Sequence, residues 1–270
     1  MMDILESLPS GARVLDLGAR TGSFTAPRAD LRVVRLDLDA PPPGASAGYV
    51  RGDAARLPFR DAAFDAIVAN HSLEHFAGLE NALREIGRVV KPGGWLYVSV
   101  PDAGTLTDRI YRWLGRGGGH VNPFRSPAAI IGPIVIWTAL PHRSTTVLFS
   151  SLAFLNARNF ITPPPRRIAL FAFGSERFLV WLAGALRWAD RVLGTRLSVY
   201  GWEFQFGGPA PLAVREPWIN VCVRCGAGAP EAWLRQAGRV RRVLRPIESY
   251  TCPHCGARNL LFRDGTIRGT

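Results

Sequence analysis

The sequence predicts an α/β fold with a doubly wound parallel sheet, followed by a helical insert and a small metal-binding appendage. Three observations predict it. Short apolar runs alternate with a helical pattern over the first hundred residues, which is typical of a parallel sheet that binds ligands at the carboxyl ends of its strands. The middle of the chain is apolar, aromatic and rich in arginine. Two Cys-x-x-Cys-Gly pairs near the end have the spacing of a zinc site.

The first predicted strand and turn carry the pattern of a cofactor site. The run 13–18 is apolar and ends in a glycine turn, and Gly22 follows before a helix start. The spacing Gly18-x-x-x-Gly22 after Asp16 differs from the G-x-G-x-x-G turn that holds a pyrophosphate. Asp37 ends the next apolar run, 21 residues after Asp16, where a carboxylate can accept both hydroxyls of a ribose. A cofactor without phosphates fits this pattern best.

The remaining strands follow from periodicity. Apolar runs predict strands over 64–69 and 95–100, with a helix between them that ends at a Lys-Pro-Gly-Gly stop. Alternating side chains predict a sixth strand over 198–206 and a seventh over 218–223. Residues 103–197 then form an insert between strands five and six, which we expect to cap the site.

The first part of the chain resembles a known family, the class I S-adenosylmethionine-dependent methyltransferases, in the branch of ubiquinone and biotin-pathway enzymes with a type 11 domain. The resemblance covers residues 14–102 and depends on four motifs in order. They are the turn 14–22, the acid Asp37, the segment 52–65 and the helix end 88–94. It implies a seven-stranded, Rossmann-like sheet and S-adenosylmethionine as the cofactor.

The resemblance also implies roles for individual residues. The expected cofactor-binding residues are Asp16, Gly18, Gly22, Asp37, Asp53, Ala54 and Asn70. The glycines would line the methionine portion and Asp37 the ribose. Asp53 and Ala54 would bind the adenine, and Asn70 would face the sulfonium. The family usually has a glycine where this sequence has Arg20, so that side chain must point away from the cofactor or block it.

Three histidines are the candidate bases. His71 follows the fourth predicted strand, His75 lies one helical turn further on, and His120 lies on a glycine-rich loop. Transfer from a sulfonium is an in-line displacement, so the enzyme aligns the reactants and removes a proton from a hydroxyl acceptor. A structural role for each histidine is the alternative. The segment after strand four lacks the Asn/Asp-Pro-Pro-aromatic motif of relatives that methylate exocyclic amines of bases.

The cysteines predict a second site. Cys222 and Cys225 form one pair, and Cys252 and Cys255 form another after 26 intervening residues. Four thiolates at this spacing are typical of a tetrahedral structural Zn²⁺ site in a zinc ribbon, with disulfides as the alternative. Between the pairs lies a basic face, which either holds RNA or an anionic lipid or is merely solvated. It comprises Arg235, Arg239, Arg241, Arg242 and Arg245.

Composition limits the remaining possibilities. The 270 residues are 47% hydrophobic and 20% charged, which excludes intrinsic disorder. The net charge of +12 suggests an anionic partner. Residues 1–100 carry a net −1 and residues 101–270 a net +13. Lys91 is the only lysine, so a bias in composition toward arginine explains the charge equally well.

No signal peptide or membrane-spanning segment is visible in the sequence. The apolar stretches 128–140 and 178–189 are shorter than a bilayer span of about 20 residues. We therefore expect a cytoplasmic protein. The helix expected over 178–193 carries arginines, so it is either an interfacial helix that rests on a membrane or an internal helix with snorkelling arginines.

These observations predict four segments. They are a cofactor-binding half (1–102), a helical insert (103–197), a closing hairpin (198–221) and a zinc ribbon (222–263). The expected function is methyl transfer from S-adenosylmethionine to an oxygen of a small-molecule or lipid-linked acceptor. One alternative is an RNA methyltransferase whose ribbon binds the nucleic acid. The other is a non-catalytic binding module with a degenerate fold.

Overall fold

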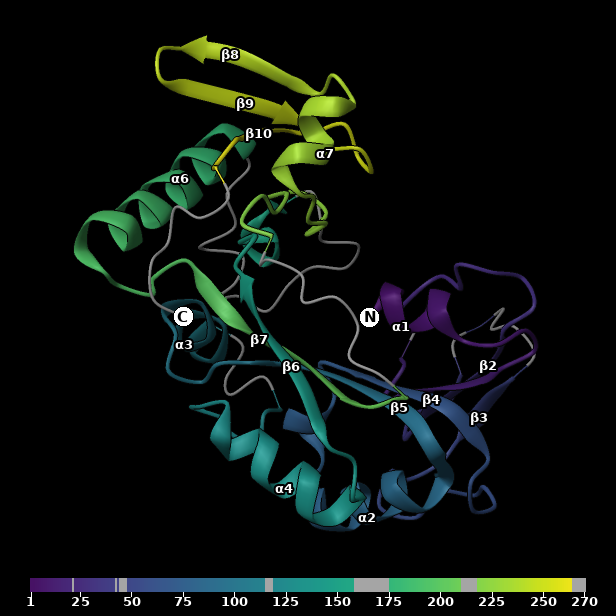
Figure 1. Ribbon diagram of the computed structural model, residues 1–270. Coiled ribbons are helices and arrows are strands. Elements are labelled where there is room, and N and C mark those ends of the chain that lie inside the picture. Colours follow the sequence, from purple (N-terminus) through teal and green to yellow (C-terminus); the bar gives the residue numbers. More distant parts are fainter. Residues whose placement is uncertain are drawn as a thin grey trace. The chain divides into compact units, whose positions relative to one another are not determined.

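The computed structural model describes residues 1–20, 22–41, 43, 48–114, 119–157, 175–209 and 218–263. The chain folds into two compact units, whose elements are labelled in Figure 1. Unit 1 comprises Met1–Asp102, Gly119–Thr146 and Trp202–Arg215, and unit 2 comprises Ala103–Gly118, Val147–Gly201 and Glu216–Thr270.

A seven-stranded sheet has the strand order β3-β2-β1-β4-β5-β7-β6. Its strands are β1 (Arg13–Leu17), β2 (Arg32–Asp37), β3 (Tyr49–Arg51), β4 (Phe64–Asn70), β5 (Val90–Pro101), β6 (His142–Phe149) and β7 (Val199–Gly207). The first five strands are parallel. Asp37 pairs with Arg51 and Asn70 with Ser99, so the carboxyl ends of these strands lie at one edge, as expected.

Helices cover both faces of this sheet in unit 1. Figure 1 shows α1 (Met2–Ser7) above the sheet, and α2 (Leu79–Val89) and α4 (Ala128–Thr138) below it. The apolar side chains of α1 pack on inward residues of β1, β4 and β5. On the other face α2 and α4 approach closely at Gly87, where a Cβ atom would lie 2.8 Å from the Cα of Thr138.

The last two strands correct the expected closing hairpin. The amide of Gly207 donates to the carbonyl of Pro141 (2.9 Å) and that of Ser150 to Ser198 (2.8 Å), so β6 and β7 are antiparallel. The strand expected over 198–206 is therefore present as β7, but its partner is β6, which lies inside the predicted insert. The prediction of a strand over 218–223 was wrong, because the structure has no strand there.

Residues 218–223 are held by the cysteine-bearing turn that follows them. Cys222 N donates to Ala227 O, Ala229 N donates to Asn220 O, and Val221 forms an isolated bridge with Gly228. The alternating pattern that predicted a sheet strand therefore serves a local turn. Strand β6 lies at the edge of the sheet, and its sequence begins with polar residues. It therefore lacks the apolar alternation that marks a buried strand.

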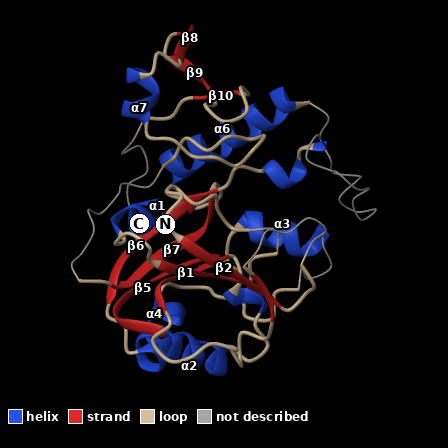
Figure 2. Ribbon diagram, turned by 90° about the vertical axis from the view of Figure 1, so that its right-hand side faces the viewer, coloured by secondary structure: helices blue, strands red, loops and turns tan. Residues whose placement is uncertain are grey.

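Unit 2 contains the remaining elements (Figure 2). They are α3 (Leu106–Leu114), α6 (Glu176–Leu193), α7 (Glu231–Gln236) and a three-stranded antiparallel sheet of β10 (Arg258–Leu260), β9 (Ile247–Thr251) and β8 (Val240–Leu244). At Gly184 of α6 a Cβ atom would lie 2.7 Å from Leu260 of β10, so this glycine permits their close approach. No described helix has the length and apolar character that a bilayer crossing requires.

Candidate functional site

The turn after β1 is connected to β2 by hydrogen bonds. The amides of Gly18 and Ala19 donate to the carbonyl of Leu36 (2.8 and 3.1 Å). The amide of Arg20 donates to Oδ2 of Asp37 (2.7 Å), and that of Asp39 donates to Oδ1 (3.1 Å). A carboxylate has about four lone-pair positions, so each oxygen of this largely buried acid retains the capacity to accept a ligand hydroxyl.

Gly18 meets two constraints that only glycine satisfies. Its φ of +72° lies in the left-handed region. A Cβ atom there would lie 2.5 Å from the Cβ of Ser72, which precedes a short 3₁₀ helix, η1 (Leu73–His75). The turn after β1 and the segment after β4 are therefore in direct contact.

Asp16 is fully buried at the end of β1. Its Oδ2 accepts a hydrogen bond from the amide of Ser23 (2.9 Å) and lies 3.9 Å from Nε of Arg35. Burial raises the pKa of Asp16, although Ser23 and Arg35 act to lower it. Asp16 therefore connects the end of β1 to the residue that follows the turn. Gly22 has φ +107°, and a Cβ atom at this position would lie 3.0 Å from Nε of Arg35.

Arg20 stands where the family usually has glycine. It has φ +44° and is exposed. Its amide binds Asp37, so the backbone of the turn still reaches the acid at the end of β2.

The other expected cofactor residues lie at the same edge of the sheet. Asp53, after β3, accepts a hydrogen bond from the amide of Ala55 at Oδ1 (2.9 Å), and Ala54 is buried. Asn70 ends β4, where its Oδ1 accepts from the hydroxyl of Ser99 (2.6 Å). The Asn70 amide nitrogen is thereby oriented by a neighbouring strand.

The candidate bases gather after β4 together with a carboxylate that sequence reasoning missed. Glu74 is 2% exposed, and its Oε1 lies 3.9 Å from Nδ1 of His71 and 4.0 Å from Nε2 of His75. A carboxylate oxygen of Glu74 and ring nitrogens of His75 and His120 all lie within 4.8 Å of one another. The only sequence signal was an acid between two histidines.

The loop that carries His120 is fixed to this segment. The amides of Val121 and Asn122 donate to the carbonyl of Glu74 (2.8 and 3.0 Å). The side-chain amide of Asn122 donates to the carbonyls of Leu73 and Phe76 (2.9 and 2.8 Å). The rings of His120 and His75 consequently meet edge to face at 4.9 Å.

The environments of His71 and His75 favour the neutral form of each ring. Burial lowers the pKa of His71 to about 4. Burial also lowers the pKa of His75, and His120 and Arg20 act in the same direction. Nδ1 of His75 lies 3.0 Å from the carbonyl of Gly119, an acceptor that requires a proton on Nδ1. The Nε2 lone pair of His75 therefore remains to accept a proton.

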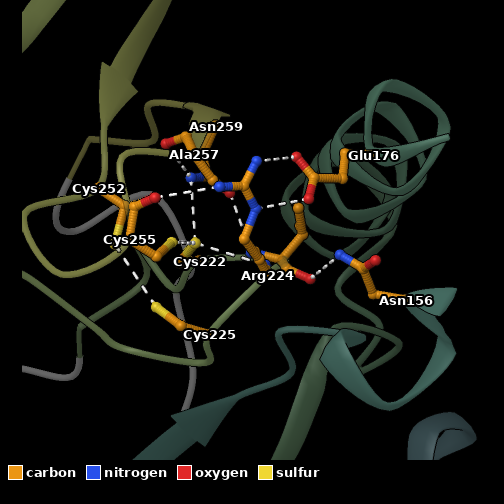
Figure 3. A network of polar contacts seen from close by, with 10 residues as sticks. Asn156, Glu176, Cys222, Arg224, Cys225, Cys252, Cys255, Ala257 and Asn259 are labelled. Atoms are coloured by element: carbon orange, nitrogen blue, oxygen red, sulfur yellow. Dashed lines mark hydrogen bonds and ion pairs between the residues drawn. The ribbon is translucent and has the colours of Figure 1, made fainter. Parts of the chain in front are cut away.

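The four cysteines form a second site in unit 2 (Figure 3). Their sulfur atoms lie within 4.8 Å of one another, with Cys222 to Cys255 and Cys225 to Cys252 both at 3.6 Å. A disulfide requires about 2.05 Å, whereas a tetrahedral metal with bonds of about 2.3 Å places sulfurs about 3.8 Å apart. The described geometry fits a metal site.

Side chains around the cysteines connect them to α6 and to η2 (Ala153–Leu155) (Figure 3). Arg224 makes two hydrogen bonds to Glu176 (2.5 and 2.6 Å) and one to the carbonyl of Cys255 (3.0 Å). The amide group of Asn259 donates to the sulfur of Cys222 (3.5 Å), and that of Asn156 donates to the carbonyl of Val223 (3.3 Å). Sequence reasoning missed these contacts, because no local pattern marks them.

Comparisons with known proteins agree on the first unit. A methyltransferase-domain family model matches residues 15–98. The chain is 34% identical over 136 residues to a malonyl-[acyl-carrier protein] O-methyltransferase of Methylococcus capsulatus, covering 45% of this chain and 50% of that protein. It is 34% identical over 176 residues to a demethylmenaquinone methyltransferase of Deinococcus radiodurans, covering 59% of this chain and 65% of that protein.

Among solved structures, the chain resembles a putative sarcosine dimethylglycine methyltransferase from Galdieria sulphuraria. The TM-score is 0.51 at 18% identity, with 78% of this chain and 83% of that chain covered. The chain spans only part of the length of these relatives, 50% of the Methylococcus protein and 65% of the Deinococcus protein. Residues 15–98 thus match the methyltransferase-domain family, and the fold is that of the class I S-adenosylmethionine-dependent methyltransferases.

Proposed function

We propose that the chain transfers a methyl group from S-adenosylmethionine to an oxygen atom of a small-molecule or lipid-linked acceptor. One observation carries the proposal: the turn that binds Asp37 and the histidine cluster meet at the same edge of the sheet, through the contact of Gly18 with Ser72. The printed names of two relatives, a malonyl-[acyl-carrier protein] O-methyltransferase and a demethylmenaquinone methyltransferase, support a small-molecule or lipid-linked acceptor, and the first of them supports transfer to oxygen.

The residues at the strand ends suit the cofactor. Asp37 retains acceptor capacity for the ribose hydroxyls, and Asp53 with Ala54 follows β3 where the adenine would bind. Bound S-adenosylmethionine supplies a methyl group on a positively charged sulfur. Asn70, which ends β4, would face this sulfur.

His75 is the base that the geometry favours for a hydroxyl acceptor. Its tautomer is set by the carbonyl of Gly119, and its lowered pKa keeps it neutral at pH 7. A neutral imidazole can take the proton that a hydroxyl loses as its oxygen is methylated. Glu74, 4.0 Å from Nε2, stabilises the imidazolium that forms.

The first test is calorimetric titration with S-adenosylmethionine and S-adenosylhomocysteine. Asp37→Ala should weaken binding by about 1.5–3 kcal/mol, or roughly 10- to 150-fold, because it removes hydrogen bonds to a charged group. Asp39→Ala is the matched control, since this exposed acid contributes only its backbone amide to Asp37. Equal losses in both variants, or no binding by the unmodified chain, would contradict the cofactor assignment.

The second test is turnover. Release of S-adenosylhomocysteine is measured with a demethylated naphthoquinol and with a malonyl thioester as acceptors. With the naphthoquinol, whose hydroxyl must lose a proton, His75→Gln should lower the rate constant by about 10²-fold or more, while cofactor affinity stays unchanged. The malonyl carboxylate carries no proton at pH 7, so its methylation should depend less on His75. Binding without turnover would support the non-catalytic module. Incorporation of methyl groups into RNA, lost in Arg241→Gln/Arg242→Gln, would support the RNA methyltransferase.

We further propose that the cysteine cluster holds one structural Zn²⁺. The sulfur distances and the hydrogen bond from Asn259 to Cys222 support this, since neighbouring donors orient and stabilise metal-bound thiolates. Metal analysis of the purified chain should give one zinc per chain. Cys225→Ser should abolish zinc binding. His254→Ala should keep the zinc content unchanged, because the exposed His254 lies outside the cluster.

A further inference from the structure

We propose that unit 2 binds the surface of an anionic lipid bilayer through the outward face of α6. This inference is independent of the methyl-transfer proposal, because it concerns a surface of unit 2 and needs no bound cofactor. The outward face is defined here as Arg177, Phe178, Trp181, Ala185, Trp188, Arg191, Val192 and Leu193, the exposed residues of the helix.

The outward face is more apolar than a helix exposed to water normally is. Trp181, Trp188 and Leu193 are 56%, 64% and 68% exposed. Phe178 and Val192 extend the same stripe at helical spacing and are also exposed. Such a continuous apolar stripe with two tryptophans is characteristic of helices that lie in the interface of a membrane.

The opposite face of α6 explains why the helix is nevertheless well held. Leu179, Ala183 and Arg187 are buried. Arg187 donates to the carbonyl of Ser150 (3.2 Å) and lies over the ring of Phe262 at 5.1 Å. This arginine therefore does not face outward, as an interfacial role for it would require. The helix packs on unit 2 through this face, and Trp181 and Trp188 on the other face remain more than half exposed.

The charges on and around the outward face are positive. The two charged residues of the face are Arg177 and Arg191, whereas the acids of α6 are engaged elsewhere: Glu176 binds Arg224, and Asp190 is buried under hydrogen bonds from the chain that follows the helix. Neither arginine forms an ion pair with a described residue. Arginines beside an apolar stripe complement phosphate headgroups.

The distribution of charge between the units agrees with this surface. Unit 1 carries 14 basic and 14 acidic residues, and unit 2 carries 19 and 7. The whole net charge of +12 therefore belongs to unit 2. The tip of the β8–β9 hairpin repeats the combination, with exposed Val243 and Leu244 beside Arg242 and Arg245.

The composition of the outward face favours lipid over nucleic acid. Single-stranded RNA is bound by aromatic rings that stack on bases, and aliphatic side chains offer no stacking surface. Val192 and Leu193 are among the most exposed residues of α6. These side chains can contribute to binding only when they are transferred from water to an apolar environment, and the interface of a bilayer provides that environment.

The test is co-sedimentation of the zinc-loaded full chain with sucrose-loaded vesicles. One preparation is phosphatidylcholine alone and the other contains 30% phosphatidylglycerol, at 0.1 and 0.5 M NaCl. We expect binding to the anionic vesicles that weakens at the higher salt. Trp181→Gln/Trp188→Gln should weaken it about tenfold or more, and Arg177→Gln/Arg191→Gln about tenfold.

The matched control is Trp233→Gln, which replaces a tryptophan of α7 that is 44% exposed. It should bind like the unmodified chain. Zinc content and the thermal midpoint confirm that each variant is folded. Absence of binding to anionic vesicles, or unchanged binding by the α6 tryptophan variant, would overturn the proposal. A poly(U) complex that the same variant abolishes, without vesicle binding, would replace it with an RNA surface.

Discussion

Unit 1 and unit 2 arrange their charged side chains in opposite ways. In unit 1 the buried acids Asp16 and Asp37 accept hydrogen bonds from backbone amides at strand ends, and basic and acidic residues are equal in number. In unit 2 arginines such as Arg224 bind carboxylates and carbonyls around the cysteine cluster. Unit 1 is thus organised by its sheet, with buried carboxylates at the carboxyl ends of β1 and β2. Unit 2 depends on side-chain contacts around four sulfurs.

Metal removal should produce the largest difference in stability between the two units. Chelation, or Cys225→Ser/Cys252→Ser, should unfold the β8–β10 region, since zinc-site folding free energies are on the order of 10 kcal/mol. Hydrogen exchange should show lost protection there, while the amides of β1 and β4 remain protected. His254→Ala is the control. Unchanged protection in β9 after metal removal would show that the cysteines do not hold unit 2.

Gly18→Ala should be the most damaging single substitution in the turn of unit 1. The new Cβ atom meets Ser72 at 2.5 Å, and φ is +72°. Strain and overpacking together should cost about 2–4 kcal/mol in the free energy of unfolding, measured by urea titration. Gly93→Ala has a similar φ of +74° with nothing near its Cβ, so it should cost only about 1 kcal/mol. Equal losses would place the whole effect in backbone strain.

Arg224→Gln should weaken unit 2 by about 1–2 kcal/mol, because it removes a two-fold, charge-assisted contact with Glu176. Arg235 also contacts two acids, Glu231 and Glu248, at a more exposed position. Arg235→Gln should therefore cost less than about 1 kcal/mol. The comparison is read from thermal unfolding of the zinc-loaded chain. A larger loss in the Arg235 variant would assign the stability of unit 2 to its surface ion pairs.

The smallest expected effect is the pH dependence of unit 1. The folded-state pKa of His71 is about 4 and its unfolded value is about 6.5. The unfolded chain therefore binds a proton first as pH falls, and stability declines between pH 6.5 and about 4. The loss between pH 7 and 6 should stay below about 1 kcal/mol, because one pH unit around the unfolded pKa of about 6.5 covers only the start of the titration. His71→Asn, which tolerates φ +51°, should flatten the profile. If the variant kept the same pH profile, the pH dependence of stability would come from groups other than His71.

The comparison of the units also separates what sequence could and could not predict. The turn at Gly18, the acid at Asp37 and the helix end before β5 are local, because glycine, proline and a strand-terminal carboxylate constrain only their neighbours in the chain. The structure confirms β1, β2 and the end of α2 at these positions. The helix expected after Gly22 is absent from the described residues 22–31, and the Lys-Pro-Gly-Gly segment expected as a stop lies within β5. The cysteine spacing was equally informative, because the two turns bring four sulfurs together.

Elements defined by distant partners were not predictable in this way. β6 is an edge strand whose partner, β7, lies about 55 residues later, and its polar start hides it. Residues 218–223 had the alternation of a strand, but their hydrogen bonds go to the turn that bears Cys225. Glu74 and Asn122 were missed for the same reason, since their roles depend on contacts between separated loops. The proposed roles of the histidines remain predictions.

The attachment of the His120 loop has an evolutionary consequence. Four hydrogen bonds from Val121 and Asn122 end on the main-chain carbonyls of Leu73, Glu74 and Phe76. Because every residue type supplies a carbonyl, substitutions at these three positions leave the loop attached. The side chains near His75 and His120 can therefore vary in evolution while the loop that carries His120 keeps its position.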